Sequence, residues 1–71
     1  MAKKPENILK EIKQYLAEKG YVIDVPLENW YAAFMIKTGY GKGKIHEWTE
    51  NFELMKLIKV EDQKVNFLQE K

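Results

Sequence analysis

The sequence predicts an α+β fold in which three helices are followed by a C-terminal β-hairpin. Three observations support this prediction. Three segments carry apolar residues at the spacing of one helical face, and the first two are followed by Gly20 and Gly39. Residues 39–43 contain three glycines, which indicates a turn. After Leu57 apolar and polar residues alternate with a period of two, as they do in strands.

The chain length and composition predict one folded domain over residues 1–71. A hydrophobic content of 45% with 13% aromatic residues is enough to build a core in so short a chain. There is no cysteine, which fits a reducing compartment. No apolar run is long enough for a signal peptide or a membrane span, so we expect a cytoplasmic protein with no membrane partner.

The charge balance excludes a strongly basic protein. Twelve basic residues, all of them lysines, oppose eleven acidic residues, and the formal net charge is +1. Any electrostatic attraction to nucleic acid must therefore be local. Lysine acts mainly as a point charge on phosphate, whereas bidentate reading of guanine edges belongs chiefly to arginine.

The first helix is expected at about residues 5–19. Pro5 suits a first helical turn, and Gly20 is placed to end the helix in the left-handed conformation. The charged residues between the apolar positions predict a solvated outer face. The expected core residues follow the i, i+1, i+4, i+7, i+8 spacing: Ile8, Leu9, Ile12, Tyr15 and Leu16.

The second helix is expected at about residues 26–38, with Pro26 in its first turn and Gly39 at its end. Residues 21–25 before it are β-branched and precede a proline, so they could form a brief strand or an extended connector. The apolar stripe of the second helix is expected to lie in the core: Leu27, Trp30, Tyr31, Phe34 and Met35.

The third helix is expected at about residues 44–57, directly after the glycine-rich turn. Its core face should contain Ile45, Trp48, Phe52 and Met55, with Leu54 at the edge of the core. The opposite face should be exposed and polar, and carries His46, Glu47, Glu50 and Asn51.

The hairpin is expected at about residues 58–68. Ile58 and Val60 alternate with polar residues in the first strand, and Val65 and Phe67 do so in the second. Residues 61–64 are all polar and predict a four-residue connection compatible with a type I turn.

This order of elements resembles the winged-helix family of DNA-binding domains over roughly residues 6–68. The residues that carry the resemblance are Thr38-Gly39 in the turn, Lys44-Ile45 at the start of the third helix, and the hairpin sequences Leu57-Ile58-Lys59-Val60 and Val65-Asn66-Phe67. The resemblance implies a three-helix winged helix-turn-helix with a C-terminal β-hairpin wing. It also implies that the third helix enters the major groove of DNA and that the wing contacts the adjacent backbone or minor groove.

Carried over residue by residue, the resemblance gives a set of DNA-binding positions. The turn would face phosphate, His46 and Asn51 would lie at base edges, and residues 63–64 would form the tip of the wing. The implied positions are Tyr40, Lys42, Lys44, His46, Glu47, Glu50, Asn51, Gln63 and Lys64. Two features depart from the family pattern. The turn holds more glycine than usual, and Glu47 and Glu50 place negative charge toward DNA unless one accepts a hydrogen bond from a cytosine amino group.

The other motifs in the chain do not predict chemistry. Residues 39–44 lack the spacing and the Ser or Thr of a phosphate-binding loop, and a helix precedes them where a strand is needed. His46 and Glu47 begin a metalloprotease-like pattern, but Glu50 stands where the second histidine would be. We therefore expect no catalytic residue, no metal and no cofactor, and the protein is not expected to be an enzyme.

Two functions remain open. The first is binding of double-stranded DNA by a small regulator of transcription or replication, of a phage, plasmid or prokaryotic type, acting as a monomer, a weak homodimer or with a protein partner. The alternative is a winged-helix protein–protein adaptor that does not bind DNA, because fold alone does not decide function. Convergence of the lysines on one face would favour DNA, and acidic residues dividing that face would favour an adaptor.

Overall fold

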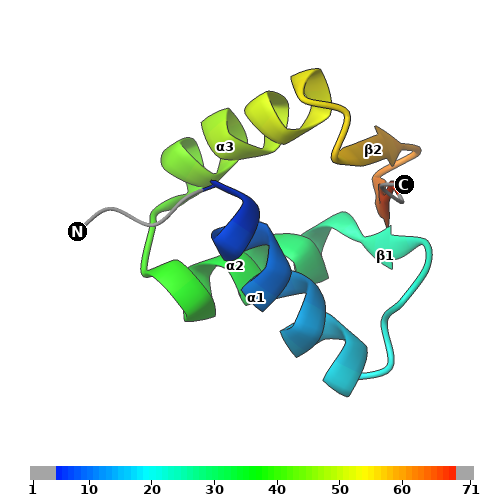
Figure 1. Cartoon of the computed structure of the whole chain (residues 1–71). Helices are drawn as coiled ribbons and strands as arrows, with labels where there is room; N and C mark the ends of the chain where they lie inside the picture. Colours follow the sequence, from blue (N-terminus) through cyan, green and yellow to red (C-terminus); the bar gives the residue numbers. More distant parts are fainter. Residues whose placement is uncertain (1–4, 69–71) are drawn as a thin grey trace.

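A computed structural model gives the structure of the chain and describes residues 5–68, so the ends of the predicted domain, residues 1–4 and 69–71, lie outside the described residues (Figure 1). The described chain confirms the α+β class and forms three helices and one three-stranded sheet. The helices are α1 (Pro5–Glu18), α2 (Leu27–Thr38) and α3 (Lys42–Leu54), and the strands are β1 (Val25–Pro26), β2 (Ile58–Glu61) and β3 (Lys64–Phe67).

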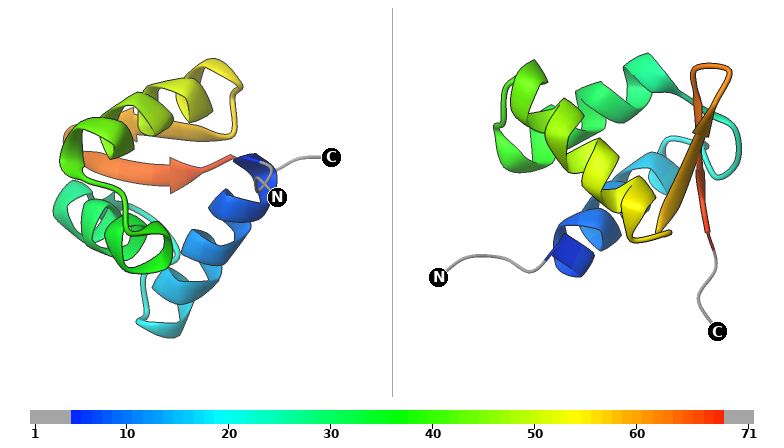
Figure 2. Two further views of the ribbon diagram at one scale, coloured as in Figure 1. Left: turned by 90° about the vertical axis from the view of Figure 1, so that its left-hand side faces the viewer. Right: turned by 90° about the horizontal axis from the view of Figure 1, so that it is seen from above.

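The sheet is small and antiparallel, with β3 in its centre in the order β1-β3-β2. The side chains of Val25 and Val60 lie on either side of Val65, their common partner in register. α1 packs against α2, α3 crosses over them, and the hairpin of β2 and β3 stands at one side of the helices (Figure 2). The sheet therefore joins the segment directly before α2 to the hairpin that follows α3.

The core is built around Trp30, which is fully buried. Its indole contacts the rings of Phe34 at 5.5 Å and Phe52 at 6.4 Å between centroids, both edge to face. Such pairs contribute about 0.5–1.5 kcal/mol beyond the area they bury. The expected core positions of the first helix are confirmed at Ile8, Ile12 and Leu16, which are all buried, and Leu9 and Tyr15 pack against them.

The predicted helix ends at Gly20 and Gly39 are confirmed, and both glycines have positive φ, at 93° and 79°. After α1 the amide of Tyr21 donates to the carbonyl of Leu16 at 2.8 Å, and the amide of Gly20 donates to the carbonyl of Ala17 at 3.0 Å. This pair of bonds is a Schellman motif, which satisfies carbonyls that the helix leaves without a donor.

The predicted bounds of the third helix are wrong at both ends. α3 begins at Lys42 rather than residue 44, because Gly43 lies within its first turn instead of in the preceding loop. It ends at Leu54 rather than residue 57. Lys56 adopts the left-handed conformation with φ 62°, and the amides of Lys56 and Leu57 complete a second Schellman motif. A lysine gives no sign of a helix end at a position that usually takes glycine.

Three expected core residues lie outside the core. Met55 follows the end of α3 and is 47% exposed, and Leu54 is 79% exposed. Met35 is 41% exposed because the buried face of α2 is centred on Trp30, Ala33 and Phe34, and Met35 falls beside that face.

The predicted four-residue connection of the hairpin is also wrong. Glu61 and Lys64 face each other as the last pair of the ladder, so the loop contains only Asp62 and Gln63. Both loop residues have positive φ, at 53° and 59°. This is the pattern of a two-residue type I′ turn. The connector at 21–25 contributes only Val25 to strand β1, and Val22 and Ile23 are exposed.

Candidate nucleic-acid interface

The outer crest of α3 is acidic and apolar. Gly43, Glu47, Glu50 and Leu54 follow one another at i, i+4, i+7 and i+11, and all four are exposed. They lie opposite Ile45, Thr49 and Phe52, which face the core. The expected exposure of the polar face of the third helix is therefore confirmed, but its centre carries two carboxylates and no lysine.

The first turn of α3 holds the two lysines nearest this crest. Gly41 is the N-cap residue and supplies no side-chain hydrogen bond, and its carbonyl accepts from the amide of Ile45 at 3.0 Å. The amides of residues 42–44 have no acceptor within the helix, so they carry partial positive charge at its N-terminus. Gly43 has open space where a Cβ would be. A phosphate could therefore approach this turn closely.

The two lysines point to different flanks of α3. Their positions are two residues apart, which is about 200° around a helix. Lys42 lies on the flank that faces α2 and makes no ion pair or ring contact with the described residues. The ammonium of Lys44 lies 4.8 Å from the ring centroid of Tyr40 on the other flank. The acidic crest runs between them, so the lysines of the turn do not form one continuous patch.

Tyr40 is half-buried between the turn and the core. Its ring lies 5.9 Å from that of Trp48 and 6.2 Å from that of Phe34. Its backbone amide donates to the Oγ1 of Thr38 at 3.1 Å. Tyr40 therefore holds the turn in place and contacts Lys44. Asn51 is exposed on the same flank of α3, seven residues after Lys44.

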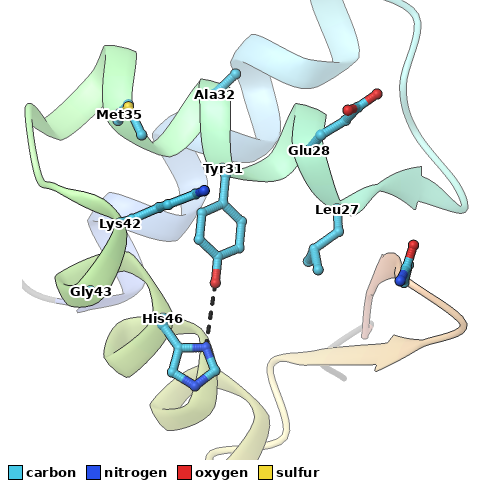
Figure 3. A pocket seen from close by; sticks show the side chains of 9 residues that line it. Leu27, Glu28, Tyr31, Ala32, Met35, Lys42, Gly43 and His46 are labelled. Carbon is cyan, nitrogen blue, oxygen red and sulfur yellow. Dashed lines mark hydrogen bonds between the residues drawn. The ribbon is translucent and has the colours of Figure 1, made fainter.

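His46 connects α3 with α2. Its Nδ1 lies 3.4 Å from the hydroxyl of Tyr31 (Figure 3). Its Nε2 lies 3.3 Å from the Oε2 of Glu50. The side chains of His46 and Glu50 are 64% and 63% exposed, so the ion pair is weak and requires a protonated imidazole. A base contact by His46 would have to compete with both of these partners.

The tip of the hairpin carries both signs of charge. Lys59 forms an exposed ion pair with Glu61 at 3.4 Å, and Asp62 precedes Gln63 in the turn. The carbonyl of Gln63 accepts from the amide of Leu27 at 2.9 Å, which holds the turn against the start of α2. Lys64 is exposed at the start of β3.

A groove of about 770 Å³ lies between α2, the first half of α3 and the hairpin turn. It brings together three of the predicted site residues, Gln63 and the two that Figure 3 labels, Lys42 and His46. The other predicted positions lie elsewhere, with Glu47 and Glu50 on the crest. The remaining lining residues are Leu27, Glu28, Tyr31, Ala32, Met35 and Gly43.

Sequence reasoning missed the α2 wall of this groove, because it assigned Leu27, Tyr31 and Met35 to the same stripe as Trp30 and Phe34. A signal was present in the spacing. Leu27, Tyr31 and Met35 follow i, i+4, i+8, and Trp30 and Phe34 form a second i, i+4 series one position earlier. Only the second series is fully buried, whereas Leu27 and Tyr31 are half-buried and still pack against the core as expected.

Neither a metal cluster nor a membrane span is found within residues 5–68. No group of three or more His, Cys, Asp or Glu side chains in this range is arranged to hold a metal ion. None of the described helices has the length and apolar character needed to cross a bilayer.

Comparisons with protein-family models, with curated proteins and with solved structures found no significant match. Function must therefore be inferred from the geometry of α3, the groove and the hairpin.

Proposed function

We propose that the chain is a winged-helix module that binds double-stranded DNA as a small regulator of transcription or replication. One observation carries the proposal. The first turn of α3 is exposed, with acceptor-free amides, a glycine in its centre and a lysine on each flank, and a β-hairpin follows the same helix. The element order and the sheet order are compatible with the winged-helix architecture.

In this mode the first turn of α3 would bind phosphate and position the crest toward base edges. Backbone amides and the ammonium groups of Lys42 and Lys44 would neutralise the phosphates. Glu47 or Glu50 would accept a hydrogen bond from a cytosine amino group in the major groove, and Asn51 would reach bases on the Lys44 flank. Gln63 and Lys64 would contact the neighbouring DNA backbone. About three phosphate contacts would give weak binding that depends steeply on salt.

The test is fluorescence anisotropy of a labelled mixed-sequence duplex over a series of salt concentrations. Replacing both lysines, Lys42→Ala with Lys44→Ala, should lower affinity and make the slope of log K against log salt shallower by about two. Lys19→Ala with Lys37→Ala is the matched control. It removes the same charge, but these ammonium groups lie 5.4 and 5.5 Å from the ring centroid of Tyr15 on the α1 side of α2.

The control variant should keep the slope of the unchanged protein. Equal slopes for both double variants would mean that the attraction is diffuse and that α3 has no phosphate site. Absence of binding to any duplex at low salt would overturn the proposal.

The second candidate function is that of a protein–protein adaptor, and the acidic crest favours it because it separates Lys42 from Lys44. Glu47 and Glu50 occupy the centre of the exposed face of α3, and Leu54 extends that face with an apolar side chain. Such a surface repels phosphate and suits a protein partner. Glu47→Gln with Glu50→Gln separates the two functions, because it should strengthen binding to duplex DNA only if the crest faces the DNA.

A further inference from the structure

The groove between α2 and α3 has the form of a helix-binding site. Its α2 wall is the stripe of Leu27, Tyr31 and Met35, and the ring of Tyr31 reaches across to His46 of α3 (Figure 3). Gly43 adds no side chain to the α3 side. The eight steps along the helix from Leu27 to Met35 span about 12 Å, which is slightly more than two helical turns. Its lining is mostly apolar, as in grooves that bind one face of an amphipathic helix.

The charges at the two ends of the groove are opposite. Glu28 lies at the end where α2 begins, beside the hairpin turn. Lys42 begins α3 at the other end, together with the acceptor-free amides of the first turn, and its side chain extends along the groove toward Tyr31 (Figure 3). A helix dipole has its positive end at the N-terminus and its negative end at the C-terminus. Charge complementarity therefore favours a bound helix that starts beside Glu28 and ends beside Lys42.

A second copy of this chain is a poor source for that helix. The apolar stripe of α1 is buried in its own core at Ile8, Ile12 and Leu16, and the stripes of α2 and α3 are buried there at Trp30 and Phe52. Apart from the α2 stripe that lines the groove itself, none of the described helices has a second apolar stripe free to fill the groove of another copy. The occupant that fits is a helix of a different protein.

We propose that this groove binds an amphipathic helix of a partner protein, with apolar residues at i, i+4 and i+7 against the α2 stripe. A basic residue in the first turn of the partner helix faces Glu28, and an acidic residue in its last turn faces Lys42. This inference rests on the second candidate function, the adaptor, and does not require DNA binding.

The probe is a designed 14-residue Ala-rich helical peptide with acetylated and amidated ends, three leucines at that spacing, arginine in the first turn and glutamate in the last. A second peptide exchanges the arginine and the glutamate. Titration into the ¹⁵N-labelled protein should shift the amide signals of Tyr31, Met35, Gly43 and His46. After correction for the helix content of each free peptide, measured by circular dichroism, the exchanged peptide should bind roughly fivefold more weakly, because in the same orientation its charges oppose those of the groove.

Two variants of adjacent residues of α2 provide the matched comparison. Met35→Glu places a charge on the groove wall and should weaken the first peptide roughly tenfold or more. Ile36→Glu changes a residue that is 62% exposed and does not line the groove. The affinity of this variant for the first peptide should stay within about twofold of that of the unchanged protein. Both residues are exposed, so both variants should keep the fold, which their ¹⁵N spectra report directly.

Three outcomes would overturn the inference. The first is that neither peptide shifts groove residues at millimolar concentration, and the second is that both variants lose affinity equally. The third is that the groove signals shift with protein concentration alone, which would identify a second copy as the occupant. Failure of DNA binding is a separate result, because it is read from duplex titrations of Lys42→Ala with Lys44→Ala, whereas the helix-binding inference is read from peptide titrations of Met35→Glu and Ile36→Glu.

Discussion

The indole Nε1 of Trp30 donates a 2.9 Å hydrogen bond to the Oγ1 of Thr49, which joins α2 to α3 inside the core. The hydroxyl of Thr49 in turn donates to the carbonyl of Ile45 at 2.7 Å. The hydroxyl of Thr49 therefore acts as both donor and acceptor. The indole N–H of Trp30, the largest side chain of the core, has a hydrogen-bond partner. This bond fixes the distance between the two helices that form the groove.

Thr49→Val should destabilise the protein by about 1–3 kcal/mol, because valine has a similar volume but leaves the indole N–H buried without an acceptor. Thr49→Ser keeps the hydroxyl and loses one methyl group, so its cost should be about 0.8 kcal/mol. Urea unfolding followed by tryptophan fluorescence measures both values. No loss for Thr49→Val, which keeps the methyl group, would mean that the hydrogen bond to Trp30 does not stabilise the core.

Lys56→Gly should stabilise the protein by about 0.5–1 kcal/mol, because Lys56 adopts φ 62° in the Schellman motif that ends α3. Glycine removes the steric cost of this conformation, and the backbone hydrogen bonds of the motif remain. Lys59→Gly is the control, since Lys59 lies in the extended strand β2, where glycine should be destabilising. The melting temperatures of the two variants should move in opposite directions.

Asp62→Asn combined with Gln63→Gly should stabilise the hairpin by about 1 kcal/mol. Asn-Gly is the preferred sequence of a type I′ turn, and both residues of this turn have positive φ. The backbone hydrogen bond from Leu27 to residue 63 does not depend on the side chain and should persist. A lower urea midpoint for this variant would show that the side chain of Gln63 contributes more than the strain that its removal relieves.

Asn66→Ala should cost about 0.5–1.5 kcal/mol, because two hydrogen bonds from β3 hold the loop before β1. The Oδ1 of Asn66 accepts from the amide of Asp24 at 2.8 Å, and its Nδ2 donates to the Oδ1 of Asp24 at 3.0 Å. Asn51→Ala serves as the control. It lies on the exposed face of α3, where alanine is the better helix former and stability should stay equal or rise slightly. Similar losses for both variants, measured by urea unfolding, would exclude a specific role for the Asp24–Asn66 pair.

Much of the fold was predictable because local signals and burial agree. The glycines at 20 and 39 end helices in the left-handed conformation, and the change of period after Leu57 correctly predicts strands. The predictions that failed concern residues whose backbone conformation their type does not favour. Lys56, Asp62 and Gln63 all have positive φ without being glycine, so neither the end of α3 nor the length of the hairpin turn was visible.

The candidate site was less predictable than the fold. The outward direction of Glu47 and Glu50 follows from helical spacing, but the separation of Lys42 from Lys44 depends on where α3 begins, which the glycines of the turn obscured. The groove depends on the distance between α2 and α3, and that distance is set by the contact between Trp30 and Thr49. No local sequence pattern in α2 or α3 indicates the distance between these two helices.

The pairing of β1 with β3 also bears on how fast the chain folds. The helices and the hairpin each form from neighbouring residues, whereas Asp24 and Asn66 are 42 positions apart in the chain and meet only when the sheet is complete. Such distant contacts require closure of a long loop before they gain any stabilising interaction. We therefore expect docking of β1 onto β3, and not helix formation, to limit the folding rate of this protein.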